Sequence, residues 1–527
     1  MSRFDWLSEY LAQLQDELIV VLHGSARYLP PAHTLEIDTE DWTRAHALAA
    51  KNGLRWAGIW ADHDSNDALI HSLLENEGDY LLLLARLDPD ADIRSITPHY
   101  PAADRPERHL HDLHGIRFED GDTRRWTRHR AWRDDEYPLM ADFPAAGHDP
   151  ADPTPADSDY PFLPIQGAGV YQIPVGPVHA GIIEPGHFRF HAVGEEVLKL
   201  EQHLGYVHKG IEKIAVGRDA EGLARLAGRI SGDTTVAHAW AACQALERAT
   251  GCRPPRRAQQ LRGLLCERER IANHLGDIGA ICNDVGFAFA QYQCARLREL
   301  WQRHSDKLFG HRLMMDCIAP GGVTIDLDDT GISTLRHDHA CIRDEIGPLF
   351  DILEDHPSLE DRLLTTGVLS LASARELGCT GHVGKASGMD FDTRSANPYA
   401  PYASHPITTQ MLGDGDVMAR MQIRMREIRD SLDWMDALLG ALRGDGPRAP
   451  LPEINEERIG IGFVEGWRGE IVSYVRLDTD GRVARFFARD PSWHHWPALE
   501  RIVMNNIVPD FPVCNKSVNG SYSGHDL

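Results

Sequence analysis

The sequence predicts an α+β protein with a small N-terminal α+β domain over residues 1–146, a linker over 147–161, and a large domain over 162–527. The large domain is expected to be mostly helical, with a peripheral β-sheet. Three features of the 527-residue chain indicate this organisation. The linker sequence GHDPADPTPADSDYP consists mainly of Pro, Asp, Gly and Ser, which cannot bury enough apolar surface to fold. Apolar residues at helical spacing dominate the chain after it, and a hairpin signal lies near the end.

Before the linker, strand-like and helix-like segments alternate. Leu18–Leu22 and Tyr80–Ala85 are apolar runs of strand length, whereas Trp42–Lys51 has the spacing of a helix. This alternation is typical of a compact α+β domain.

After the linker, Val170–Phe190 is rich in glycine and β-branched residues, which predicts strands. Two long helices are predicted from apolar positions at helical spacing. The first series is Leu264, Ile271, Leu275, Ile278 and Cys282, and the second, with steps of three or four residues, is Met421, Met425, Ile428, Leu432, Met435 and Leu439. Such series are typical of helices packed in the core of a bundle.

Several arginines lie off these series. Arg420, Arg424 and Arg429 accompany the second helix, and Arg268 and Arg270 accompany the first. Charged residues on a helix usually occupy a solvated or interface face, and this is the expectation for Arg256, Arg257, Arg268 and Arg270.

A hairpin is predicted close to the end of the large domain. Glu470–Leu477 and Val483–Ala488 are strand-like runs, and Asp480-Gly481 stands between them. Asp-Gly between such runs supplies the positive backbone angles that tight hairpin turns require. The residues after the hairpin form a turn-rich tail.

The charge balance excludes one class of partner. With 79 acidic and 54 basic residues, the chain has a formal charge of −25. Duplex nucleic acid binds clustered cations, so nucleic acid is not an expected partner.

The composition also indicates the compartment. No window reaches about 18 consecutive apolar residues, and residues 1–15 lack the order of a signal peptide. The nine cysteines include no CxxC pair, so neither a zinc site nor a disulfide framework is indicated. We expect a cytoplasmic protein that reaches the cell membrane only through partner subunits.

The segment Ser95–Pro144 contains a specific pattern of charged and apolar residues. It resembles the signature of the accessory hydrophilic subunit of respiratory complex I, with matches at Glu107, Asp112, Gly115, Ile116 and Phe118. The same segment contains three histidines near Asp112, namely His109, His111 and His114. A metal site there is an alternative, but the resemblance implies a contact between subunits.

The large domain resembles a second family. Gly176–Lys213 is similar to the start of the large subunit of membrane-bound, energy-converting (group 4) nickel–iron hydrogenases and of the quinone-site subunit of complex I. Gly378–Tyr402, Gly413–Ile428 and Asp490–Leu499 continue this resemblance in the same order. The fusion of accessory and large domains is that of the formate-hydrogenlyase type.

The chain departs from this family at the metal-binding positions. Nickel–iron hydrogenases hold their metals with four thiolates from two CxxC pairs, because soft sulfur ligands suit low-valent nickel and iron. The four positions here are Ser231, Thr234, Ser521 and Gly524. Hydroxyl oxygens are hard donors and glycine offers no side chain, so this chain is expected to bind neither nickel nor any other cofactor, and not to be an active hydrogenase.

The resemblance assigns a set of site residues around the lost metals. Glu184 and His187 match the loop that carries the proton-shuttling acid, and Asp233, His238 and Arg468 should converge on it together with the tail residues Asn519, Ser521 and Tyr522. Buried acids, bases and cations in such a cavity can accept protons near neutral pH. Structural roles are the alternative, since Glu184 and His187 can be a satisfied buried pair, and Asp233 can cap a helix.

These features predict a subunit of the peripheral arm of a membrane-bound, complex I-like or hydrogenase-like oxidoreductase that couples electron transfer to ion translocation. The resemblance implies an iron–sulfur small subunit and antiporter-like membrane subunits as partners, with the iron–sulfur clusters in the small subunit. It also implies quinone-binding and NADH-linked activity of the complex. However, Ile230 stands where the complex I subunit has its quinone-contacting tyrosine, and the chain has no nucleotide-binding motif. The alternative is a structural subunit that couples its partners without redox chemistry.

Overall fold

The computed structural model describes residues 5–18, 27–64, 67–89, 91–128, 133, 135–147, 160–179, 183–442 and 446–527. Most of the predicted linker, and residues 19–22 of the first predicted strand, lie outside these ranges; Leu18 is the last residue of a helix. The chain combines helices with several small sheets, which confirms the predicted mixed fold class.

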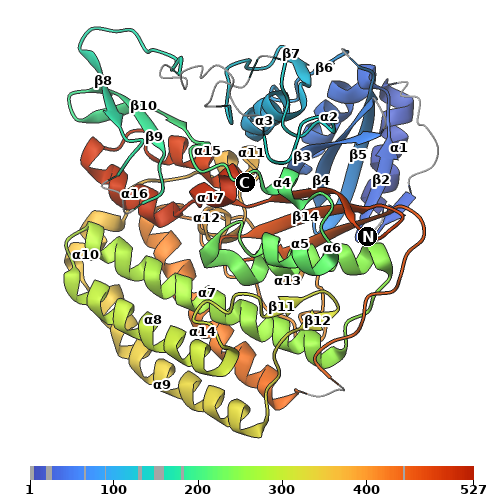
Figure 1. Ribbon diagram of the computed structural model, residues 1–527. Coiled ribbons are helices and arrows are strands. Elements are labelled where there is room, and N and C mark those ends of the chain that lie inside the picture. The colour runs from blue at the N-terminus through green and yellow to red at the C-terminus, as the bar shows by residue number, and fades with distance from the viewer. Residues whose placement is uncertain are drawn as a thin grey trace.

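The N-terminal domain is built on a five-stranded sheet with the order β1-β2-β5-β4-β3 (Figure 1). The strands are β1 (Arg27–Leu29), β2 (Ala32–Glu36), β3 (Arg55–Asp64), β4 (Asp67–Asn76) and β5 (Asp79–Leu87), and only β2 and β5 pair in parallel. The accompanying helices are α1 (Asp5–Leu18), α2 (Trp42–Lys51) and α3 (Asp104–His114), with a short strand pair of β6 (Asp92–Arg94) and β7 (Arg117–Glu119).

Both faces of this sheet are buried. One face packs with α2 in the main core, while Trp60, Leu73 and Tyr80 on the other face pack against a sheet of the large domain. The partner sheet is β13 (Arg458–Glu465), β14 (Glu470–Leu477) and β15 (Val483–Arg489), which includes the predicted hairpin. Burial on two sides explains why the predicted strand around residues 80–85 is continuously apolar rather than alternating.

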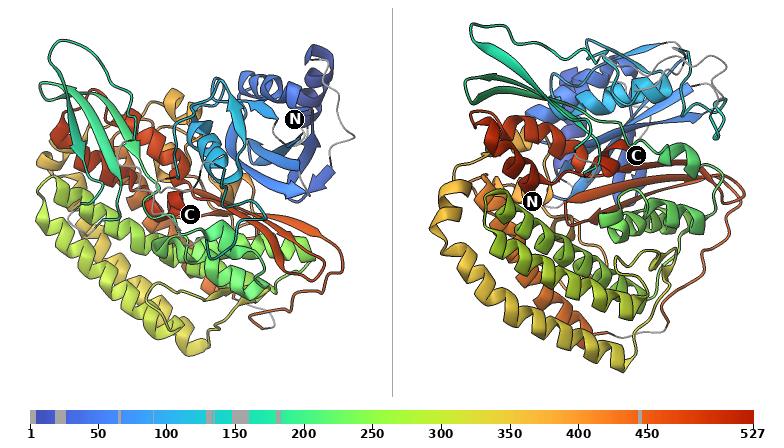
Figure 2. Two further views of the ribbon diagram at one scale, coloured as in Figure 1. Left: turned by 45° about the horizontal axis from the view of Figure 1, so that its top comes forward. Right: turned by 60° about the vertical axis from the view of Figure 1, so that its left-hand side comes forward.

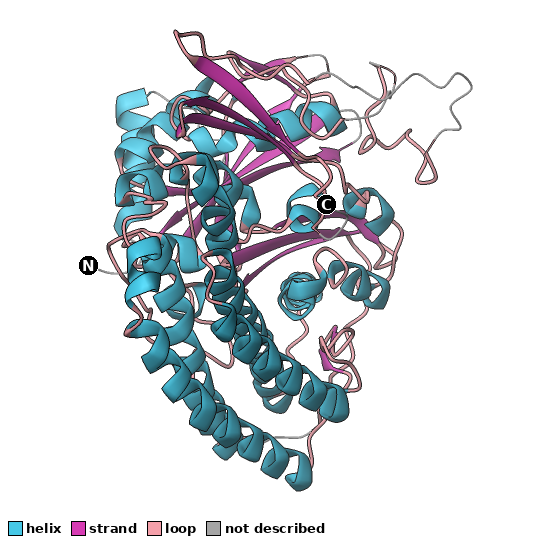
Figure 3. Cartoon of the chain, turned by 90° about the vertical axis from the view of Figure 1, so that its left-hand side faces the viewer, coloured by secondary structure: helices cyan, strands magenta, loops and turns pink. Residues whose placement is uncertain are grey.

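The large domain contains four long helices that lie side by side (Figure 2, Figure 3). They are α7 (Arg256–Asp284), α8 (Ala288–Phe309), α9 (Asp329–Glu354) and α14 (Val417–Gly440). All the apolar positions predicted for α7 and α14 are buried, which confirms the two helical series.

Helix α6 (Thr235–Thr250) lies against the sheet of β13–β15. Gly460 and Gly462 on β13 make this contact close, since a Cβ atom at either residue would lie 2.0 Å from a carbonyl oxygen of α6. Alanines of α6 complete the small-residue contact.

Shorter elements complete the large domain. A separate sheet of β8 (Val170–Val175), β9 (His187–Val193) and β10 (Glu196–His203) projects from its edge (Figure 1), and β11 (Ile318–Ala319) pairs with β12 (Gly322–Val323). The short helices are α4 (Ile211–Ala215), α5 (Ala220–Ala227), α10 (Pro357–Leu363), α11 (Leu371–Glu376), α12 (Gly381–Ala386) and α13 (Thr393–Ala396). The expected turn-rich tail is instead mostly helical, in α15 (Ser492–Ile502), α16 (Phe511–Val518) and α17 (Tyr522–Asp526).

The expectation of a solvated or interface face was wrong for Arg268 and Arg270, whereas Arg256 is exposed. Arg268, Arg270, Arg420 and Arg424 are buried, whereas Arg429 is exposed. Each buried guanidinium reaches acceptors on other segments; Arg268, for example, binds Asp338 on α9 at 3.0 Å. Long arginine side chains are buried where carboxylates or carbonyls satisfy all their donors.

A buried ionic cluster joins the two domains. Arg55 on β3 donates to Glu75 at 2.7 Å and to both carboxylate oxygens of Glu470 on β14 at 3.0–3.1 Å. Glu470 also accepts hydrogen bonds from Tyr80 and Arg489. The contact between the domains therefore depends on one carboxylate that receives donors from both.

We predict that Arg55→Leu lowers the free energy of unfolding by about 3–5 kcal/mol, because it leaves two carboxylates buried without their main cation. Denaturant unfolding followed by tryptophan fluorescence measures this loss. Arg362→Leu is the control, since the Arg362–Asp510 pair at 3.2 Å is largely exposed on the arginine side and is worth less than about 1 kcal/mol. Equal losses in the two variants would contradict a special role of the buried cluster.

Candidate functional site

The four positions where relatives would carry thiolates come together from opposite ends of the large domain. Ser231 and Thr234 lie at the turn before α6, and Ser521 and Gly524 lie at the start of α17. The hydroxyl oxygens of Ser231 and Ser521 are 2.9 Å apart, although the residues are 290 positions apart in the chain. Ser521 also caps α17, because its hydroxyl accepts a hydrogen bond from the Gly524 amide at 2.9 Å.

Asp233 is the centre of this hydroxyl cluster, by which we mean Ser231, Thr234, Ser521 and Asp233. Its carboxylate accepts hydrogen bonds from Ser231 at 2.6 Å and Thr234 at 3.0 Å. Arg468 binds the same carboxylate with two nitrogens, at 2.8 and 2.7 Å. Burial by itself would raise the pKa of Asp233, but the Arg468 guanidinium and the hydroxyl donors lower it to about 2.

A second buried polar pair, His238 and Asp490, lies beside the cluster. Nε2 of His238 on α6 is 2.8 Å from a carboxylate oxygen of Asp490, and both side chains are fully buried. Burial would raise the pKa of Asp490, but the bond to His238 and the nearby Arg468 keep it below its usual range. A Cβ atom at Gly524 would lie 2.8 Å from the Asp490 carboxyl carbon, so this carboxylate fills the space beside Gly524.

Glu184 is exposed and contacts Ser523, two residues after Ser521 of the cluster. Its carboxylate accepts hydrogen bonds from the amide of Ser523 at 3.0 Å and from its hydroxyl at 2.9 Å. Lys209 lies beside it and donates to the carbonyl oxygens of Ile230 at 2.9 Å and Ser523 at 3.3 Å. The two backbone segments of the cluster are thus held together by one ammonium group.

The tail residues Asn519 and Tyr522 also lie close to these groups. The Asn519 carbonyl accepts a hydrogen bond from Nε of Arg468 at 2.7 Å, and the Asn519 side chain donates to Asp277 at 2.7 Å. The Tyr522 ring packs on Trp496, 4.7 Å between centroids, and lies against Gly186 in the loop that carries Glu184.

His187 lies apart from the hydroxyl cluster. Its ring lies 5.0 Å from that of Phe162, and its Nε2 accepts a hydrogen bond from Arg189 at 3.3 Å. Burial and the Arg189 charge lower its pKa. His187 and Arg189 line an open cavity of about 1070 Å³, together with Arg124, Tyr160 and Phe162. Glu184 accepts hydrogen bonds from Ser523, whereas His187 accepts one from Arg189. The two residues therefore have different hydrogen-bond partners.

Two residues of the site were missed from the sequence. Asp490 and Lys209 both stand in segments that are noted only for their family resemblance, Asp490–Leu499 and Gly176–Lys213. The aspartate could have been suspected from its place at the end of β15, where it precedes a helix, but only the fold brings it to His238.

The residues at the former ligand positions do not fit a nickel–iron centre. The Ser231 and Ser521 hydroxyls bond to each other rather than spanning a metal-sized gap, and Thr234 bonds to an Asp233 carboxylate that Arg468 already neutralises. Among the described residues, no three His, Cys, Asp or Glu side chains are grouped to hold a metal ion, and the histidines of α3 are no exception.

Three family models match successive parts of the chain. Residues 36–149 match the 30 kDa subunit of respiratory-chain NADH dehydrogenase, 209–276 match nickel-dependent hydrogenase, and 284–458 match the 49 kDa subunit of the same dehydrogenase. Formate hydrogenlyase subunit 5 of Escherichia coli is 30% identical over 465 residues, which cover 87% of this chain and 82% of the relative. The chain belongs to the nickel–iron hydrogenase and complex I large-subunit family.

Other relatives agree with this assignment. The carbon monoxide-induced hydrogenase of Rhodospirillum rubrum is 32% identical over 66% of this chain and 97% of its own length. A component of the NADH-quinone oxidoreductase of Phocaeicola vulgatus is 28% identical over 80% of this chain and 84% of its own length.

A solved structure supports the fold. A chain of the membrane-bound sulfane sulfur reductase, an archaeal respiratory membrane complex, superimposes with a TM-score of 0.64 and 25% identity. It covers 69% of this chain and matches over its whole length. In the part of this chain that the structure describes, no helix has the length and apolarity needed to cross a bilayer.

We predict that Asp233→Asn destabilises the protein at neutral pH and that this difference disappears in acid. Because the pKa of Asp233 is lowered from 3.8 to about 2 on folding, its stabilising effect is complete above pH 3.8 and is lost as the pH falls through about 2. Unfolding of wild type and variant, measured at a series of pH values, tests this. A difference that stays constant down to that pH would contradict the Asp233–Arg468 pairing.

Proposed function

We propose that this protein is a metal-free large subunit in the peripheral arm of a membrane-bound, complex I-like or hydrogenase-like oxidoreductase, where it takes part in coupling electron transfer to ion translocation. The observation that carries the proposal is the direct Ser231–Ser521 hydrogen bond at the place where relatives carry metal-bound thiolates. Family membership supports the assignment to such a complex.

The electrons would belong to partner subunits. An iron–sulfur small subunit would bring its clusters toward the hydroxyl cluster, and antiporter-like membrane subunits would carry the ion. The chain itself would be cytoplasmic and held at the membrane by these partners. NADH oxidation, if the complex performs it, would occur on another subunit, since this sequence contains no nucleotide-binding motif.

The protein's own contribution would be proton handling. Glu184 is exposed and bonds to Ser523, two residues from Ser521, so it can exchange protons between solvent and the cluster. Asp233 is suited to remain an anion, because Arg468 stabilises its charge. A quinone headgroup would find room in the cavity beside His187, where Tyr160 and Phe162 offer aromatic surface.

One observation favours the alternative of a structural, non-redox coupling subunit. The carboxylates of Asp233 and Asp490 are already paired, with Arg468 and His238 respectively. Under this alternative the cluster only holds the tail against α6, and the subunit transmits conformational change between its partners.

We predict that the purified native complex contains no nickel in this chain, because hydroxyl and glycine positions replace every soft ligand. Metal analysis by mass spectrometry of the intact complex measures it. A stoichiometric nickel signal, or infrared bands of carbonyl- or cyanide-ligated iron, would disprove the metal-free assignment.

We predict that Glu184→Gln reduces turnover of the assembled complex by at least about tenfold, because an amide cannot exchange the proton. Glu195→Gln is the matched control, since Glu195 is an exposed glutamate at the turn between β9 and β10. Ser523→Ala should give an intermediate loss. Normal turnover of Glu184→Gln with normal assembly would favour the structural alternative.

A further inference from the structure

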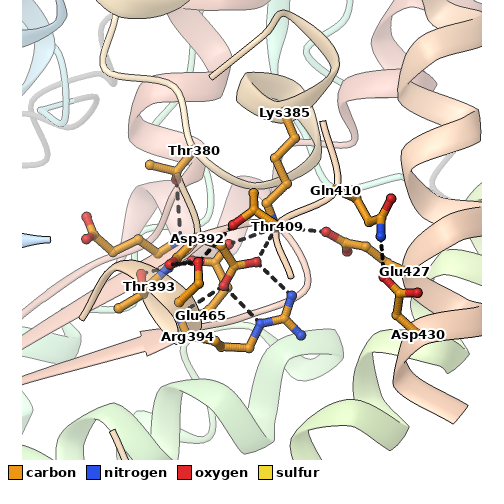
Figure 4. A network of polar contacts seen from close by, with 12 residues as sticks. Thr380, Lys385, Asp392, Thr393, Arg394, Thr409, Gln410, Glu427, Asp430 and Glu465 are labelled. Atoms are coloured by element: carbon orange, nitrogen blue, oxygen red, sulfur yellow. Dashed lines mark hydrogen bonds and ion pairs between the residues drawn. The ribbon is translucent and has the colours of Figure 1, made fainter. Parts of the chain in front are cut away.

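A second polar network lies inside the large domain, away from the hydroxyl cluster (Figure 4). Its side chains come from α7, α12, α13, α14, β13 and the segment before α13, and all are buried. We define the buried charge network as Glu267, Arg270, His274, Lys385, Asp392, Arg394, Glu427 and Glu465.

The network contains one carboxylate more than it has permanent cations. Its acids are Glu267, Asp392, Glu427 and Glu465, whereas its permanent cations are Arg270, Lys385 and Arg394. Burial lowers the pKa of His274, which therefore adds no charge at neutral pH even though it bonds to Glu427 at 2.7 Å. An uncompensated buried charge is costly, so a proton is favoured on one member.

Three of the four carboxylates are each bound by two cations. Lys385 and Arg394 bind Asp392, Arg270 and Arg394 bind Glu267 at 3.0 Å, and Lys385 and Arg270 bind Glu427 at 2.8 and 3.5 Å. These contacts use most of the donors of the three cations.

Glu465 is the carboxylate left over. Its Oε2 accepts hydrogen bonds from the Thr393 amide at 3.1 Å and hydroxyl at 2.9 Å. Its Oε1 has no hydrogen-bond partner among the described residues, and the Lys385 ammonium lies 3.6 Å away. Figure 4 shows Glu465 beside Asp392, the neighbour whose charge opposes its ionisation.

Some of the groups that face Glu465 from other elements raise its pKa, and others lower it. Burial first, and then the Asp392 charge, raise its pKa to about 7, against the effects of Lys385, Arg394 and Arg270. Tyr399 and Cys266, which also face this residue, bond to its backbone and not to its carboxylate.

The network has a route to solvent. A cavity of about 20 Å³ lies between Glu427, Arg394, the half-buried Gln410 and the exposed Asp430. This is room for about one water molecule among polar partners. From Glu427 the Lys385 ammonium leads on to Glu465, because it contacts both carboxylates.

We propose that Glu465 is a proton-binding site inside the large subunit, which takes up one proton on Oε1 and releases it again through Lys385, Glu427 and the water-sized cavity. On uptake, the Lys385 ammonium gives a proton to Oε1 of Glu465 and takes one from a hydronium ion on the Glu427 side, which leaves as water, so Lys385 is an ammonium before and after the step. The network then carries no excess charge. That Glu465 binds a proton does not depend on the proposed function. Only the use of this proton in ion coupling rests on it.

Infrared titration of the full chain tests the proposal. The wild type should show a carboxylic-acid carbonyl band that disappears with a midpoint near pH 7, and the band should be missing from Glu465→Gln. Glu269→Gln is the matched control: Glu269 is also a buried carboxyl whose pKa burial raises, to about 8, but it bonds to amides at the start of α6. The control should keep the Glu465 band.

A milder variant provides a test if Glu465→Gln does not fold. Thr393→Val removes the hydroxyl that stabilises the ionised carboxylate, so proton affinity should rise about tenfold and the midpoint should move up by about one pH unit. The proposal is overturned if the midpoint of Thr393→Val does not move. It is also overturned if the difference spectrum of wild type minus Glu465→Gln shows only carboxylate bands between about pH 5 and pH 9. Neither result depends on nickel content or turnover, so the proposed function can fail separately.

Discussion

Buried arginine side chains that meet carboxylates from distant segments determine how this chain is assembled. Arg55 binds Glu470 across the domain contact, and Arg468 binds Asp233 across the candidate site. In each case the partners lie more than 200 residues apart. A buried guanidinium without its carboxylate is strongly unfavourable, so these pairs restrict the chain to the one arrangement that satisfies them. The apolar core supplies the favourable burial, and the ion pairs select its geometry.

The candidate site illustrates how one fold can hold different chemistry. Two chain segments approach each other where relatives would carry metal-binding thiolates. Here hydroxyl groups close that approach with a hydrogen bond, and the Asp490 carboxylate fills the space beside Gly524. The framework that would position a metal instead positions an ion pair and a surface glutamate. This difference is the basis for proposing proton handling without a metal.

Two carboxylates in the same domain have opposite properties because of their neighbours. Asp233 receives two nitrogens of Arg468 and two hydroxyls, which lower its pKa to about 2. Burial and the neighbouring Asp392 anion raise the pKa of Glu465 to about 7, although the Lys385 ammonium lies 3.6 Å away. Such separation of pKa values distinguishes a permanent charge from a group that exchanges protons. Asp233 is therefore suited to keep its negative charge, whereas Glu465 is suited to bind and release a proton.

The sequence by itself determined the fold class, the two buried helical series and the hairpin, because these depend on local periodicity and turn residues. It also identified Asp233, His238, Arg468 and Glu184 as neighbours of the tail through family resemblance. Only the tertiary structure separated His187 from them, paired His238 with Asp490, and placed Arg268, Arg270, Arg420 and Arg424 in the interior. Side-chain pairing across hundreds of residues has no local signature, and an arginine looks the same in sequence whether water or a buried carboxylate receives its hydrogen bonds.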